Sequence, residues 1–167
     1  MKEKKIEARK SKISGSGLFA KQDIKAGESI CNMNGELMDL DLMIHKVDND
    51  LEEGSDPLGI DDKMYMDLDE PYRCCNHSCF PNAFLRGKNE LVAIKDISKD
   101  EEITFDYSTT MDDQIPREEQ WTMKCKCKSP NCRKVVDQFK FLPRSVQKYY
   151  LDNKFAPDFI LRNFKNI

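Results

Sequence analysis

Residues 73–82 have the sequence RCCNHSCFPN, and this run decides how the rest of the chain is interpreted. An amide, an imidazole and a thiol stand together at Asn76, His77 and Cys79, which is more polar chemistry than an ordinary core segment carries. The run has too little charge for a solvated loop. Buried amide and imidazole groups need hydrogen-bond partners. The run therefore predicts either a polar binding site or a polar pair satisfied by neighbouring backbone.

A cysteine cluster follows at residues 125–132, CKCKSPNC. In a reduced protein, closely spaced cysteines indicate metal binding or catalysis before they indicate disulfides. Tetrahedral zinc takes four ligands, and Cys125, Cys127 and Cys132 supply three. The cluster alone leaves open whether a further cysteine, such as Cys74 or Cys75, completes a site or whether the three thiols stay free.

The composition is that of one globular domain with a tail. The 167 residues are 39% hydrophobic and 34% charged, with a net charge of -3, a polar mixture that still supports a core. Duplex DNA binding needs clustered Lys and Arg, which this charge balance does not favour. The sequence shows no secretory signal and no apolar run as long as a membrane span. We therefore expect an intracellular protein, cytoplasmic or nuclear, without a membrane or direct nucleic-acid partner.

Short apolar stretches separated by glycine, proline and asparagine predict a mostly-β fold of several small sheets. The expected strands are residues 6–12, 18–20, 29–33, 64–67, 83–86, 90–94 and 103–105. Residues 83–94 form a predicted hairpin around Gly87. The tail from residue 135 has apolar residues at helical spacing, and Pro157 is placed to begin a last short helix.

Three stretches together resemble the SET-domain protein-lysine methyltransferases that carry a post-SET zinc motif. The family's N-H-S-C-x-P-N signature matches residues 76–82, its E-E-[IL]-T-F-D-Y signature matches residues 101–107, and a weaker G-x-G lies at residues 15–17. The order and spacing also match, so the resemblance covers roughly residues 4–133.

The resemblance implies a SET-domain fold with a knot-like C-terminal threading, a post-SET zinc loop and short C-terminal helices. It implies a SET domain at residues 4–110 with a variable insert near 38–63, a post-SET segment at 120–133 and a helical tail at 134–167. The insert is acidic, which is consistent with a solvated helix and loop or with an acidic wall that attracts a basic peptide.

By resemblance, the function is methyl transfer from S-adenosylmethionine (SAM) to the side-chain amine of lysine in a protein, either a histone tail or another basic protein. The alternative is a zinc-stapled peptide-binding module that has lost turnover. Met33, where many relatives have tyrosine, and the pair Cys74-Cys75 favour that alternative. The sequence does not specify the substrate protein or the oligomeric state.

The resemblance also implies where SAM binds. Two glycines flanking one residue let the backbone approach a ligand closely, although such a pattern alone is typical of an ordinary turn. In the family this loop lies against SAM, and the Asn-His pair with a preceding arginine holds it. The cofactor candidates are Ser14, Gly15, Ser16, Gly17, Arg73, Asn76 and His77.

The resemblance assigns the catalytic role to Tyr107, whose phenol can orient the amine and the methyl group. Lysine has a pKa near 10.4, so only about one amine in a thousand is neutral at pH 7. A dry channel and the nearby sulfonium both favour the neutral form. Tyr65 is a candidate for the polar role that Met33 cannot fill. Phe105 lies at the position that tunes methyl number, and its missing hydroxyl favours di- or trimethylation.

The same resemblance implies that Cys79 joins the cysteine cluster as fourth ligand of a structural zinc. The implied ligands are Cys79, Cys125, Cys127 and Cys132. A site closed by four sulfurs has no open position for water, so the metal is expected to hold the tail in place. Family members also place an aromatic residue of this region over the lysine channel, a role for which Phe139 and Phe141 are the candidates.

Overall fold

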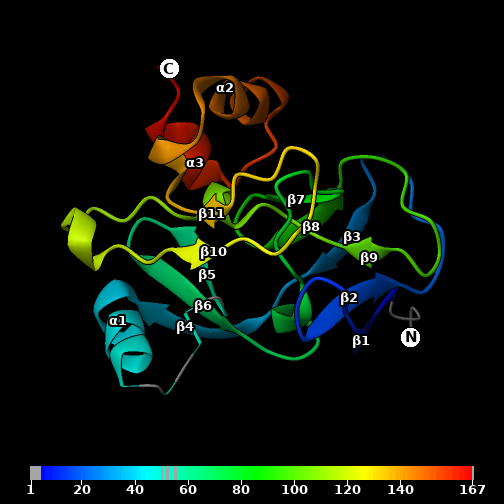
Figure 1. Cartoon of the computed structure of the whole chain (residues 1–167), viewed down its shortest axis with the longest axis horizontal. Helices are drawn as coiled ribbons and strands as arrows, with labels where there is room; N and C mark the ends of the chain where they lie inside the picture. Colours follow the sequence, from blue (N-terminus) through cyan, green and yellow to red (C-terminus); the bar gives the residue numbers. More distant parts are fainter. Residues whose placement is uncertain (1–4, 50, 52, 55, 167) are drawn as a thin grey trace.

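Small antiparallel sheets form the body of the molecule (Figure 1). The computed structural model describes residues 5–49, 51, 53–54 and 56–166. Within them, the first sheet has the order β1-β2-β9, the second β3-β8-β7, the third β4-β6-β5, and β10 pairs with β11. The strands are β1 (Ile6–Lys10), β2 (Ser16–Ala20), β3 (Ser29–Asn32), β4 (Gly35–Asp39), β5 (Pro57–Asp61), β6 (Met64–Leu68), β7 (Ala83–Arg86), β8 (Glu90–Ala93), β9 (Glu102–Ile103), β10 (Met123–Lys124) and β11 (Val135–Val136). The expected mostly-β fold is confirmed.

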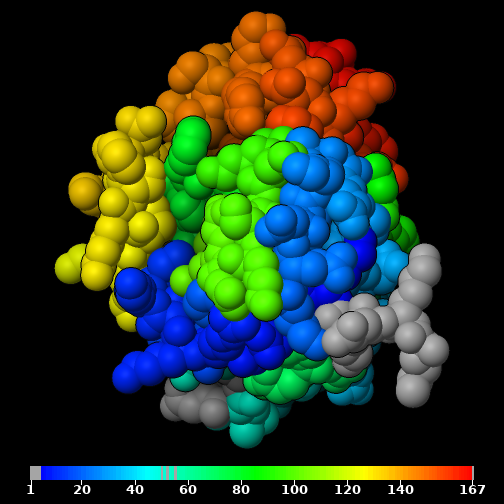
Figure 2. All heavy atoms as spheres, turned by 90° about the vertical axis from the view of Figure 1, so that its right-hand side faces the viewer, coloured from blue at the N-terminus to red at the C-terminus, as the bar shows by residue number. Residues whose placement is uncertain are grey.

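The hairpin of β7 and β8 is paired as the sequence predicts. Ala83 lies opposite Ala93 and Arg86 opposite Glu90. Gly87 opens the connecting turn with a φ of 64°, a left-handed conformation that glycine adopts without steric cost. Figure 2 shows the blue N-terminal strands beside the light green segment around β9, in agreement with the pairing of β2 and β9.

Helices lie at the insert and at the C-terminal end. The α-helices are α1 (Leu40–Asp48), α2 (Arg144–Asn153) and α3 (Asp158–Asn163), and the short 3-10 turns are η1 (Tyr72–Cys74), η2 (Tyr107–Thr110), η3 (Arg117–Glu119) and η4 (Phe139–Phe141). The Asp39 side chain caps α1 by accepting the Leu42 amide at 2.8 Å. No helix in the described ranges is long and apolar enough to cross a membrane.

The insert and the tail each differ from the sequence-based expectation. The insert contains the expected helix, but its second half is β5, which completes a sheet with β6. The helical spacing seen from residue 135 produces a strand and a 3-10 turn first, and the helix begins only after Pro143. Proline fixes the backbone at a helix start and cannot donate a helical hydrogen bond, which places the boundary there.

Two buried clusters account for most of the packing. The larger one joins the three sheets, with Leu18, Met33 and Ile103 fully buried. The smaller one lies under the C-terminal helices, where Phe139 and Ile160 are fully buried. The tail therefore has an apolar core of its own, and it contacts the domain where Phe155 packs against Phe84 of β7, with ring centroids 4.7 Å apart.

The two motifs quoted from the sequence lie side by side in the fold. His77 and Phe105 form a parallel bridge. The Ser78 amide donates to the Phe105 carbonyl at 3.1 Å, and the Thr104 amide donates to Asn82 Oδ1 at 2.9 Å. Asn82 thus fixes the second motif against the first, and Tyr107 follows directly after the paired segment.

Candidate functional site

A cavity of about 130 Å³ opens where α1, the sheet of β4, β5 and β6, and the chain after β9 meet. Its aromatic lining residues are Tyr65, Phe105, Tyr107 and Trp121. Its acidic lining residues are Asp48, Asp56, Asp113 and Glu119. Arg73 also lines the cavity, with its guanidinium held by Asp67 at 3.0 Å and by the Leu68 carbonyl at 2.7 Å. The cavity thus combines aromatic walls with an excess of carboxylates.

Tyr107 is half-buried at the wall of this cavity. Its hydroxyl donates to the Cys75 carbonyl at 2.8 Å, which fixes the direction of the phenol. Its ring packs against Phe105, with ring centroids 4.9 Å apart. Burial raises the pKa of Tyr107 above its ordinary value, so the phenol stays protonated at neutral pH. Tyr107 can therefore orient a ligand by hydrogen bonding, and it is not a strong base.

His77 is buried, and both nitrogens of its ring have partners within the chain. Nδ1 accepts the Tyr107 amide at 3.2 Å, and Nε2 lies 3.3 Å from Cys79 Sγ. Burial lowers the pKa of His77 to about 4, although Asp106 opposes that shift. The neutral ring thus positions the backbone of Tyr107, and the His77 side chain does not line the cavity.

Asn76 joins the glycine-containing loop to the second motif. Its Nδ2 donates to the carbonyls of Ser14 and Ser16 at 3.2 and 2.9 Å and to Glu102 Oε1 at 2.9 Å. A Cβ added at Gly17 would overlap the Glu102 carboxylate, so close packing against Glu102 explains this glycine.

At the other glycine of the loop the space is open. Gly15 has a φ of 44°, and a Cβ added there would meet no atom within 4 Å. Ser14, Gly15 and Ser16 are exposed. The loop is therefore held at Asn76 and Glu102, while its outer side stays accessible.

Tyr65 lines the cavity from β6, and its hydroxyl donates to Asp113 Oδ1. Burial raises the pKa of Tyr65 above its ordinary value, and the adjacent Asp113 carboxylate adds to that shift. Gln138 donates to the other carboxylate oxygen of Asp113 at 3.0 Å. Asp113 was not among the residues that the sequence predicted for the site.

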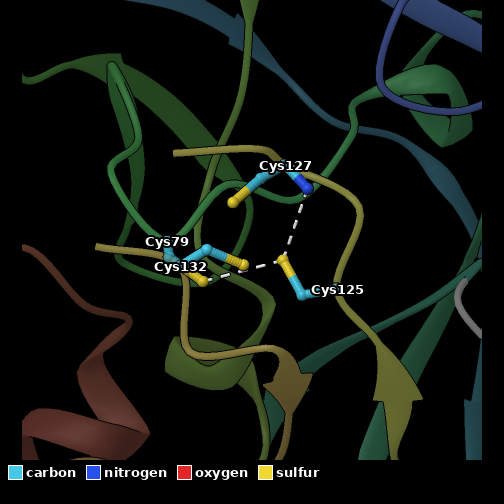
Figure 3. A group of neighbouring side chains, drawn as sticks. All are labelled: Cys79, Cys125, Cys127 and Cys132. Atoms are coloured by element: carbon cyan, nitrogen blue, oxygen red, sulfur yellow. Dashed lines mark hydrogen bonds between the residues drawn. The ribbon is translucent and has the colours of Figure 1, made fainter. Parts of the chain in front are cut away.

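The four predicted metal-binding cysteines converge on one point (Figure 3). All four sulfurs lie within 4.8 Å of one another, and Cys79 Sγ is 3.7 Å from Cys125 Sγ. A disulfide bond is about 2.05 Å long, so this pair is not a disulfide. Tetrahedral zinc with bonds of about 2.3 Å places its sulfurs about 3.8 Å apart. The cluster therefore has the size and donor set of a four-sulfur metal site.

Backbone amides surround the cluster and favour thiolates. The amides of Cys127, Arg133 and Lys134 each donate to a cluster sulfur at 3.4 Å. Burial opposes ionisation of Cys127, but hydrogen bonds from backbone amides and from the thiols of Cys125 and Cys132 outweigh it and lower the pKa of Cys127 to about 7. Burial raises the pKa of Cys79 to about 11. A bound cation would keep all four sulfurs ionised, because metal ligation requires the thiolate.

Asp106 links the cysteine cluster, the site and the tail through one buried carboxylate. Arg133, next to Cys132, reaches Asp106 Oδ1 at 2.7 Å. The Tyr150 hydroxyl of α2 donates to Oδ2 at 2.8 Å, and His77 Nδ1 lies 3.5 Å from Oδ1. Because Asp106 directly precedes Tyr107, these contacts hold the peptide that carries the cavity tyrosine.

Replacing Tyr150 with phenylalanine is expected to lower the free energy of unfolding by about 1–2 kcal/mol, because a buried carboxylate loses one of its donors. Urea unfolding followed by circular dichroism measures the change. Tyr149→Phe is the matched control, because Tyr149 is adjacent and exposed. Equal effects of the two substitutions would show that the hydroxyl of Tyr150 is not needed.

The aromatic residue that the C-terminal half of the chain adds to the cavity differs from the two that were predicted. Trp121 lines it, and its indole lies against Gly54, where an added Cβ would overlap the ring. The candidates for an aromatic cover, Phe139 and Phe141, are not among the described lining residues. Phe139 is fully buried under the C-terminal helices, and Phe141 is half exposed beside Arg117. Trp121 is the aromatic residue that segment 120–133 supplies to the described lining.

Comparison with known proteins gives relatives over most of this chain. It is 33% identical over 142 residues to the histone-lysine N-methyltransferase TRX1 of Oryza sativa, covering 77% of this chain and 13% of the relative. It is 31% identical over 162 residues to the histone-lysine N-methyltransferase, H3 lysine-36 specific, of Saccharomyces cerevisiae, covering 82% of this chain and 20% of the relative. The chain thus spans a small part of these relatives' length.

A solved structure and a family model agree with these relatives. The structure of KRYPTONITE in complex with mCHG DNA and SAH superposes with a TM-score of 0.59 over 78% of this chain and 28% of that chain, at 24% identity, which shows the fold. The SET domain model matches residues 15–108, a range that holds the glycine loop, the Asn-His motif and Tyr107. With the motifs paired in space and relatives above 30% identity, this chain belongs to the SET-domain family.

Proposed function

We propose that this chain transfers a methyl group from SAM to the side-chain amine of a lysine in a protein substrate. The observation that carries the proposal is the position of Tyr107 on the wall of a small aromatic and acidic cavity. An alkylammonium chain has an apolar stem and a cationic end, and both match such a lining. The histone-lysine methyltransferases among the relatives support this reaction class.

The proposed SAM site consists of the glycine-containing loop together with Asn76, His77 and Arg73. Among the described residues, no donor reaches Asn76 Oδ1, so this oxygen can accept a hydrogen bond from a bound cofactor. The accessible outer side of Ser14 to Ser16 lies next to that side chain. Because the His77 ring is occupied by protein contacts, His77 contributes backbone atoms. SAM supplies an electrophilic methyl group on its sulfonium.

The residues of this chain then have separable tasks. The carboxylates of the lining attract the amine as an ammonium ion, which must lose its proton to solvent before it reacts, and the positive charge of bound SAM would favour that loss. The Tyr107 hydroxyl orients the neutral amine. Phe105 is buried in the cavity wall and carries no hydroxyl that would hold a water there. This wall supports addition of more than one methyl group. The four cysteines are proposed to hold a structural zinc that fixes the segment carrying Trp121.

The alternative function, a peptide-binding module without turnover, was favoured by Met33 and by the pair Cys74-Cys75, and the position of Met33 no longer favours it. Met33 is fully buried in the main core and is not among the described lining residues of the cavity. The missing tyrosine at that position therefore does not thin the cavity wall. Cys75 does line the cavity, but its carbonyl is the group that orients Tyr107.

The test is transfer of labelled methyl from SAM to core histones, other basic proteins and a whole-cell lysate. Acid hydrolysis and amino-acid analysis identify the methylated residue, and mass spectrometry counts the methyl groups. The expected product is methyl-lysine. Label confined to another residue type, or no label above that of heat-denatured protein, would contradict the proposal.

Gly17→Ala is expected to weaken SAM binding roughly tenfold. The added methyl group displaces the Glu102 carboxylate, which accepts from both Asn76 and Ser11, and so loosens the loop. Isothermal titration calorimetry with SAM measures the loss. Ser98→Ala is the control, because Ser98 is exposed and lies outside the loop. Unchanged affinity in Gly17→Ala would remove the loop from the proposed site.

A further inference from the structure

Asp113 is a buried carboxylate with no ion pair among the described residues. Its exposed fraction is 8%. The donors to its carboxylate are neutral: the Tyr65 hydroxyl on Oδ1 and Gln138 Nε2 on Oδ2 at 3.0 Å. Lys140 Nζ reaches only its backbone oxygen, at 3.5 Å. Burying a carboxylate without a counter-ion is costly, so a charge at this position needs a reason.

The position of Asp113 is fixed from several sides. Its amide donates to Gln138 Oε1 at 2.7 Å, and Gln120 Nε2 donates to its carbonyl at 3.1 Å. Gln138 is fully buried, so the same side chain holds both the backbone and the carboxylate of Asp113. A carboxylate has room for about four hydrogen bonds, and two are used here. The remaining capacity is available to a ligand in the cavity.

Asp113 lines the cavity that also contains Tyr107. The cationic lining residue Arg73 is directed to Asp67 and the Leu68 carbonyl. The described lining therefore offers Asp113 aromatic and apolar neighbours but no salt-bridge partner. A ligand that brings its own positive charge would supply the missing counter-ion, and aromatic rings stabilise an organic cation further.

We propose that Asp113 is a specificity-determining residue: its carboxylate, held in place by Tyr65 and Gln138, makes the cavity prefer a cationic side chain over a neutral one. The inference rests on the proposed function in one respect, namely that the natural cation is the ammonium group of the substrate lysine. It assigns Tyr65 a positioning role, since its hydroxyl is directed to Asp113.

The test uses n-butylammonium chloride and n-butanol, which share a four-carbon stem and differ in charge. Each is titrated into the whole chain at constant ionic strength, and binding is followed by the fluorescence of Trp121, the single tryptophan, which lines the cavity. The wild-type chain is expected to bind the ammonium roughly tenfold or more tightly than the alcohol. Asp113→Asn is expected to remove that preference.

Asp112→Asn is the matched control. Asp112→Asn changes the net charge by the same amount as Asp113→Asn. Asp112 is not among the described lining residues, so this variant should keep the preference for the ammonium. Tyr65→Phe removes one of the two donors that hold the Asp113 carboxylate and should weaken the preference for the ammonium without abolishing it. Asp113→Ser is a second neutral variant for use if Asp113→Asn does not fold. No preference in the wild-type chain, or an equal preference in a folded neutral variant at Asp113, would overturn the inference.

These probes need no turnover, so the two proposals fail separately. A chain that methylates lysine and shows no charge preference refutes the role of Asp113 and leaves the transferase intact. A chain that prefers the ammonium probe and transfers no methyl group refutes the transferase alone. With a methylated substrate identified, Asp113→Asn should raise KM more than it lowers kcat, whereas a residue that only maintained the fold would reduce the amount of active protein.

Discussion

Tyr107→Phe is expected to lower kcat for methyl transfer by about a hundredfold or more, the usual cost of removing a positioned hydrogen-bonding group from a reacting centre. The lost hydroxyl is the one that the Cys75 carbonyl fixes at the cavity wall. SAM affinity should stay within about twofold, because the ring and its packing against Phe105 remain.

Single-turnover transfer and calorimetry with SAM separate these two effects. Tyr149→Phe removes an exposed hydroxyl at the surface of α2 and serves as the control. The variant should unfold at a urea concentration close to that of the wild type, since one hydrogen bond contributes about 1 kcal/mol. Wild-type turnover in Tyr107→Phe would refute the proposed role of the phenol.

Metal removal is the second change expected to have a large effect. A chelator such as 1,10-phenanthroline should release one zinc per chain and free residues 121–134 for proteolysis, because a four-sulfur site contributes on the order of 10 kcal/mol of apparent folding free energy. Trp121 packs in one cluster with the cysteines and with Tyr107, so its emission should shift to longer wavelength. The cavity should then lose one wall, and transfer should cease.

Cys127→Ser should reproduce this result without a chelator. Cys74→Ser is the matched control, because Cys74 lies outside the cluster and a serine hydroxyl can keep its hydrogen bond to Glu70. Metal content measured by elemental analysis checks both variants. A Cys127→Ser chain that retains full zinc and an unchanged Trp121 spectrum would show that the cluster is not the metal site.

The local pattern of the sequence was sufficient for β1, β2, β3, β6 and β9, for the hairpin of β7 and β8 around Gly87, and for the start of α3 after Pro157. Each of these depends on residues close together in the chain. The convergence of Cys79 with a cluster more than forty residues away was implied only by the family resemblance, and the structure brings these sulfurs together. The pattern did not predict β4, β5, β10 or β11. The insert that holds β5 offered helix-forming and acidic residues but no clear alternation, and β10 and β11 are only two residues long.

The cavity was the hardest part to predict, because its lining comes from segments far apart in the sequence. Trp121 and Asp113 carry no motif, and their roles depend on contacts with Gly54, Tyr65 and Gln138. For the Asn-His pair, the sequence predicted the site but not the role of each side chain. The motif indicated a polar site, but only the three-dimensional contacts show that the His77 ring supports the backbone of Tyr107.

The shared carboxylate of Asp106 has a consequence for how such chains diverge. Arg133 is the cation that pairs with Asp106. A related chain with a neutral residue in place of Arg133 alone would therefore have a buried, unpaired carboxylate beside Tyr107. A neutral residue at either position is tolerable only if the other becomes neutral too. We therefore expect the residues at the two positions to covary.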